Sequence, residues 1–139
     1  MRALILLSAL ALVACGRPGS ATPTAAHKAV EFKKGQGLLV DVEAAKFIGL
    51  EKQAVESAGN TPVIPSTAIL ETSEGSFAYV VNGPRLLRTA VQLGPVKGAT
   101  VAVTDGLLEG DVIAVAGVKY LWFAELQSVK GGVGCADGH

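Results

Sequence analysis

Short runs of apolar residues alternate with turn-forming residues along the middle of the chain, from residue 62 to residue 117. Inside these runs the apolar positions also alternate. Phe77, Tyr79 and Val81 fall on one face of an extended segment, and Ala78 and Val80 fall on the other. Such short strands are typical of a small antiparallel β-barrel or sandwich, and we predict that one face forms the core. The expected strands cover residues 63–70, 77–81, 86–93, 100–104 and 112–115.

Turn residues separate the expected strands. Asn82-Gly83 is a hairpin signal because both central residues of a type I′ turn need a positive φ, which Asn tolerates and Gly adopts freely. Asp105-Gly106 opens a second turn-rich stretch that runs to residue 111. The spacing of these turns predicts hairpin connections, which join antiparallel strands.

We expect one short helix before this β-region. Asp41 can cap it, Gly49 supplies a left-handed stop after it, and residues 50–55 follow as another strand. The helix is too short to be stable without packing against the rest of the protein. Its expected apolar side consists of Val42, Ala45, Phe47 and Ile48.

A second helix is expected after the β-region, within residues 119–129. Trp122 and Leu126 stand four residues apart, as do Tyr120 and Ala124, so this helix would present an apolar stripe. Two interpretations of the stripe remain open. Trp122 and Phe123 either cap the end of the core, or they form a docking face for a partner. Exposure of both rings would favour docking.

Four ordered motifs resemble the membrane-proximal β-domain of periplasmic adaptor proteins. These adaptors, also called membrane fusion proteins, serve resistance-nodulation-division (RND) efflux pumps, and the heavy-metal branch is the most similar. The resemblance implies a β-domain that docks on the inner-membrane pump component, with turns near Asn82 and Asp105 or the Trp122 and Phe123 stripe as candidate contacts. The motifs are VIP at 63–65 with TAIL at 67–70, FAYVVNG at 77–83, RTAVQLG at 88–94 and DGLLEGDVIAVAG at 105–117.

The segment before them, from residue 34 to residue 56, resembles the lead-in to that domain. In the adaptors the chain then leaves to build a β-barrel, a lipoyl domain and an α-helical hairpin before it returns. Here residues 56–62 join the two pieces directly. We therefore expect an adaptor-like domain without the hairpin and lipoyl domains.

The N-terminus predicts a lipoprotein signal peptide over residues 1–14. A positive start at Arg2 precedes an apolar run over residues 3–13, and Leu-Val-Ala-Cys at 12–15 fits the pattern at which bacterial lipoproteins are cleaved and acylated. Cys15 would then carry the lipid and hold the protein on the periplasmic side of a bacterial membrane. The alternative is an ordinary secretory peptide cut after Ala14.

Composition and charge exclude some partners and leave others open. The chain of 139 residues suits a single domain, and its 12 basic and 12 acidic residues cancel, so no overall field favours nucleic acid. No catalytic motif is present in the sequence, and we expect no enzymatic activity. The expected organisation is a flexible tether at 15–29, the β-domain at 30–129 and a Gly-rich tail at 130–139.

The tail brings together Cys135, Asp137 and His139, which are donors that could bind copper, zinc or silver. Their spacing matches no closed zinc module, so an unpaired thiol without a ligand role is the alternative. The sequence thus leaves three hypotheses: an accessory protein of an RND efflux system, a small periplasmic metal-binding lipoprotein, or an adaptor remnant without a function.

Overall fold

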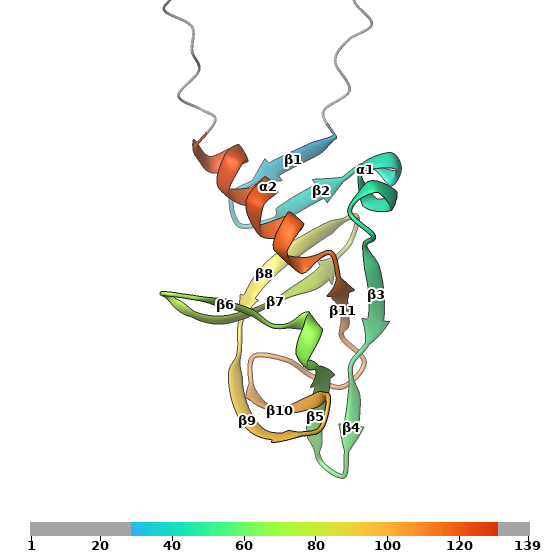
Figure 1. Cartoon of the computed structure of the whole chain (residues 1–139), viewed down its shortest axis with the longest axis vertical. Helices are drawn as coiled ribbons and strands as arrows, with labels where there is room; N and C mark the ends of the chain where they lie inside the picture. Colours follow the sequence, from blue (N-terminus) through green and yellow to red (C-terminus); the bar gives the residue numbers. More distant parts are fainter. Residues whose placement is uncertain (1–28, 131–139) are drawn as a thin grey trace, which may run out of the picture.

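The computed structural model describes residues 29–130 (Figure 1). These residues form two antiparallel β-sheets and two α-helices. The predicted fold class is confirmed, because the chain is mainly β with a sandwich-like arrangement and the sheets do not close into a barrel.

The larger sheet has seven strands and lies at the same end of the molecule as helices α1 (Val42–Phe47) and α2 (Val118–Lys130) (Figure 1). Its strand order is β1-β2-β8-β7-β11-β3, and β6 pairs with β7 outside this path. The strands are β1 (Val30–Lys33), β2 (Gly37–Val40), β3 (Glu51–Ala54), β6 (Leu70–Thr72), β7 (Gly75–Asn82), β8 (Arg85–Ala90) and β11 (Val112–Ala116).

The smaller sheet lies at the opposite end and has the order β4-β5-β10-β9 (Figure 1). A tight β4–β5 hairpin forms its tip, with Ala58 paired to Thr61 across the turn. The strands are β4 (Glu56–Ala58), β5 (Thr61–Pro65), β9 (Gln92–Lys97) and β10 (Thr100–Asp105).

Two of the expected strands are each divided in the structure. Residues 63–70 contain the last three residues of β5, the 3-10 turn η1 (Ser66–Ala68) and the start of β6. Residues 86–93 are split between β8 and β9 around Val91. Both breaks have the same cause, because the chain passes from one sheet to the other there. Val55, Ala68 and Val91 lie at such crossings, and all three are buried in the core between the sheets.

The expectation of a single core face was wrong. Strand β7 is buried on both sides, with Ala78 in the core between the sheets and Tyr79 in a second core between the larger sheet and α2. Neighbouring residues of a strand point to opposite faces, so one strand supplies both cores. Its alternation was correctly predicted, but the covering of its second face by α2 was not.

A hairpin of β1 and β2 precedes α1 and was not predicted. Gly37 turns the chain with φ at +90°, and a Cβ atom on this residue would collide with the backbone carbonyl of Leu86. Only glycine permits this close approach, which lets Leu38 pair with Leu86 in β8.

Helix α1 forms as predicted but does not bury the expected side. The Asp41 carboxylate accepts a hydrogen bond from the backbone N–H of Glu43 at 2.9 Å, and Gly49 follows the helix with φ at +62°. Val42 and Phe47 are nevertheless exposed. Ile48, just after the helix, packs against the core beneath α2 and anchors this turn of chain.

Candidate functional site

Helix α2 carries the aromatic residues that the sequence singled out, and its inner side faces the larger sheet. Val118 and Leu121 are buried in the core beneath the helix. Glu125 lies four residues after Leu121, on the same side of the helix, and is also buried. A carboxylate in such a position needs partners, because an unpaired buried charge is costly.

Tyr79 and Arg88 supply those partners from the adjacent strands β7 and β8. The Tyr79 hydroxyl donates a hydrogen bond of 2.7 Å to Glu125 Oε2, and Arg88 Nε donates one of 3.0 Å to Glu125 Oε1. Tyr79 and Arg88 are opposite each other in the strand register. The two donors therefore engage both oxygens of one carboxylate and tie α2 to the sheet.

The tyrosine in this cluster is a fixed donor. Burial, foremost, and then the hydrogen bond to Glu125 raise the pKa of Tyr79 well above its usual value of about 10. Its hydroxyl therefore stays protonated at neutral pH and continues to donate to the carboxylate.

Arg88 also lies between two aromatic rings. Its guanidinium carbon is 4.4 Å from the centroid of Phe77 and 4.8 Å from the centroid of Trp122. Both distances suit cation–π contacts. Arg88 Nη1 lies 3.7 Å from Glu74 Oε2, which is an ion pair beyond hydrogen-bond distance. Trp122 is thereby held against the sheet.

We refer to Tyr79, Arg88 and Glu125 as the polar cluster. Its arrangement supports a role in positioning α2 on the sheet, because each oxygen of the buried carboxylate accepts a hydrogen bond from a strand of that sheet. The sequence-based predictions did not include this cluster, although the sequence carries a signal for it: Glu125 shares its side of the helix with Leu121 and Trp122.

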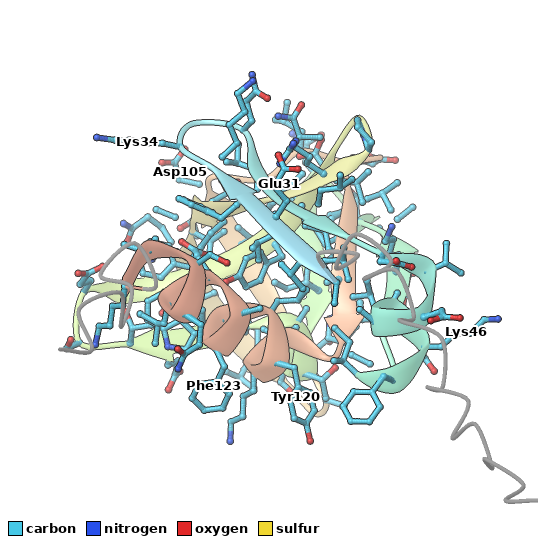
Figure 2. The ribbon with its side chains drawn as sticks, turned by 90° about the horizontal axis from the view of Figure 1, so that it is seen from above. Glu31, Lys34, Lys46, Asp105, Tyr120 and Phe123 are labelled. Carbon is cyan, nitrogen blue, oxygen red and sulfur yellow. The ribbon has the colours of Figure 1, made fainter. Side chains whose placement is uncertain are left out.

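The outer side of α2 is different in character. Tyr120 and Phe123 are each 58% exposed, and Figure 2 shows their rings pointing away from the sheets. Each of the two interpretations of the stripe therefore applies to one of two neighbouring residues. Trp122 is half-buried and packs against the core beneath α2, whereas Phe123 faces outward.

The four candidate docking residues do not form one surface. Asn82 is exposed at the end of β7, and Pro84 in the β7–β8 turn borders a hollow beside α1. Asp105 is exposed at the end of β10 and borders a different hollow, with Asn60 of the β4–β5 turn. Trp122 and Phe123 belong to α2.

Other predicted site residues lie outside the described part of the chain. These are Cys15 of the expected lipid attachment and Cys135, Asp137 and His139 of the expected metal site. Within residues 29–130, no three His, Cys, Asp or Glu side chains are grouped so that they could hold a metal ion. Neither helix in that range has the length and hydropathy needed to cross a membrane.

The geometry therefore offers two features that bear on function, the polar cluster that fixes α2 and the exposed side of the helices. Comparison with known proteins adds no assignment to either, since no family model matches the chain and no curated protein matches it.

Proposed function

We propose that this protein is a lipid-anchored periplasmic accessory protein of an RND-type efflux system, of the heavy-metal type. It acts by docking on the inner-membrane pump component and not by catalysis. The proposal rests on the resemblance to the membrane-proximal domain of periplasmic adaptors, and three features of the fold support it.

The first feature is the placement of the resembling motifs. They fall on β5, η1, β6, β7, β8, β9 and β11, and on the turn before β11. In that turn Asp111 Oδ2 accepts a hydrogen bond of 2.8 Å from the Leu108 backbone N–H. These strands belong to both sheets and surround the core between them. The motifs are thus parts of one packed unit, as expected for one domain of an adaptor.

The second feature carries the proposal. Between β4 and β5 the chain makes a tight hairpin at Gly59-Asn60. This hairpin lies within residues 56–62, where the resemblance implies that adaptors insert their outer domains. The β-domain is therefore complete without an insertion there. A domain that keeps the pump-side part of an adaptor suits an accessory role at the pump.

The third feature is that the chain entry and the β4–β5 turn lie at opposite ends of the molecule. The chain enters the described fold at β1, beside the helices, and the β4–β5 turn lies at the far end (Figure 1). A membrane anchor on the N-terminal side would therefore be joined to the end of the fold opposite that turn, as an adaptor whose outer domains extend away from the membrane requires.

Crosslinking in membranes tests the proposal. The acylated protein, treated with a mild crosslinker in cells of its source, should co-purify with an RND pump. We expect Asp105→Lys to reduce the recovered pump several-fold, because reversal of an exposed charge in a contact opposes association. Glu56→Lys reverses another exposed carboxylate of the smaller sheet and is the matched control.

Recovery of the anchored wild-type protein without any pump would reject the proposal. If Asp105→Lys and Glu56→Lys reduce the recovered pump equally, the pump remains the partner but Asp105 has no specific part in the contact.

A further inference from the structure

Exposed apolar side chains gather on the two helices. The described residues include eight large exposed hydrophobic side chains, and five of them belong to α1 and α2. Phe47 has the largest exposed fraction, 90%. We call the three aromatic residues among these five the helical face; they are Phe47, Tyr120 and Phe123.

The two helices that carry this face are adjacent. Gly117, just before α2, lies so close to the end of α1 that an added Cβ atom would be 3.1 Å from the Ile48 carbonyl oxygen. Phe47 is the residue just before Ile48, and Tyr120 lies three residues after Gly117. Tyr120 and Phe123 point to the same side of the molecule (Figure 2). The exposed rings therefore flank one junction between the helices.

The charges around the helical face are mostly basic. Lys46 of α1 and Lys119 and Lys130 of α2 are exposed. The one carboxylate of α2, that of Glu125, is buried and paired with Arg88, so the outer side of this helix presents no negative charge. Exposed Glu43 on α1 is the acidic exception. Aromatic rings beside lysines are typical of side chains that lie in the headgroup layer of a membrane.

The entry point of the chain lies beside the same helices. Asp41, which caps α1, donates a backbone hydrogen bond of 3.0 Å to the carbonyl oxygen of Ala29, the first described residue. Thirteen residues lie between Cys15 and Ala29, so this segment spans at most about 50 Å even when fully extended. An acylated Cys15 would therefore keep the helical end within about 50 Å of the bilayer surface.

We propose that the helical face lies in the headgroup layer of an anionic phospholipid bilayer, as a second membrane contact besides the lipid anchor. The inference rests on the acylation of Cys15 that is part of the proposed function. It assigns Tyr120 and Phe123 to lipid, and it leaves the exposed turns to a protein partner. A single anchor holds a domain at the surface without orienting it, and the helical face supplies the orientation.

Fluorescence of the acylated full-length protein tests this contact. Trp122 is the only tryptophan in the chain and lies next to Phe123. We expect lipids with brominated acyl chains to quench Trp122 emission in vesicles that contain phosphatidylglycerol. The double variant Tyr120→Ser, Phe123→Ser should lose at least half of this quenching while the anchor keeps it on the vesicles.

The matched control is the double variant Val96→Ser, Leu108→Ser. It removes two exposed hydrophobic side chains outside the helices and should be quenched as strongly as the wild type. Emission in ordinary lipid reports whether each variant retains its fold around Trp122.

The outcomes separate this inference from the proposed function. Acylated protein that floats with the vesicles but shows no quenching, or equal quenching in wild type and the α2 variant, would overturn the helical face as a lipid contact and leave the anchor in place. Crosslinks from Phe123 to a pump would also overturn it, and would assign the face to protein. Absence of acylation in the mass spectrum would overturn the anchor on which the inference rests, whereas pump recovery tests the docking separately.

Discussion

Glu125 is the residue that most changes the interpretation of this sequence. On the chain it is one carboxylate within an apolar helix, and in the fold it accepts hydrogen bonds from Tyr79 and Arg88. Removing one partner from such a cluster leaves a buried charge or acceptor unpaired, which costs more than the pair contributes. The stability of α2 on the sheet therefore depends on all three side chains.

Alkaline unfolding tests this dependence at the residue scale. The pKa of Tyr79 is raised in the folded protein, so above pH 10 the unfolded chain releases a proton that the folded chain keeps. The stabilisation is fully present below that pH and is lost as the pH rises, by up to about 1.4 kcal/mol for each unit. Urea unfolding at pH 9 to 11 should show this loss.

The Tyr79→Phe variant should be less stable throughout and should show a smaller loss with rising pH, because it has no proton to release at this site. Tyr120→Phe removes the exposed tyrosine and should keep the wild-type dependence. Equal slopes for Tyr79→Phe and wild type would contradict the raised pKa.

At the scale of elements, α2 has two sides with different roles. Leu121 is fully buried in the core beneath the helix, and Phe123, two residues later, faces outward. Strand β7 shows a similar division, since its two faces serve two cores. The periodicity of each segment predicted its type correctly, but it did not show which sides other elements cover.

Alanine substitutions on α2 should reveal the two sides. We expect Leu121→Ala to lower the free energy of unfolding by about 2–5 kcal/mol, because it leaves a cavity beneath the helix. Phe123→Ala should change it by less than about 0.5 kcal/mol, because its ring is largely exposed. Chemical unfolding followed by Trp122 fluorescence measures both. Comparable losses in the two variants would show that Phe123 is covered in the protein.

At the scale of the whole molecule, the helices and the β4–β5 turn mark opposite ends (Figure 1). The chain crosses repeatedly between the sheets, and buried residues such as Val55 and Val91 lie at those crossings. The β4–β5 turn takes no part in them, and its residues Gly59 and Asn60 are exposed. Exposed turns of this kind tolerate inserted chain.

Insertion of an eight-residue Gly/Ser segment between Gly59 and Asn60 should preserve cooperative unfolding, at a cost of about 1–2 kcal/mol for closing the longer loop. The same insertion after Gly106 is the control. There φ is +99° and the backbone lies against the Ala90 carbonyl, so we expect cooperative unfolding to be lost. Thermal unfolding of both variants measures the difference. A larger loss of stability on insertion at Gly59-Asn60 than on insertion after Gly106 would reject this turn as the site where outer domains could be accommodated.

The sequence predicted much of the local structure, because local structure depends on neighbouring residues. The Asp41 cap, the Gly49 stop and the helical spacing around Trp122 are all encoded within a few positions, and all appear in the fold. The expected strands failed where a tertiary crossing, at Ala68 or at Val91, divides an unbroken apolar run. The apolar pattern of such a run is the same whether the chain continues in one sheet or passes into another.

By itself, then, the sequence determined the fold class, the alternation of strands and turns, and the helix on each side of the central strands. Only the tertiary structure decided that Trp122 faces the core while Phe123 faces outward, that Tyr79, Arg88 and Glu125 meet, and that Asn82 and Asp105 lie apart. The physical reason is the separation along the chain of the residues that interact. Backbone conformation is set largely by adjacent residues, whereas burial and the pairing of charges depend on side chains that come from distant parts of the chain.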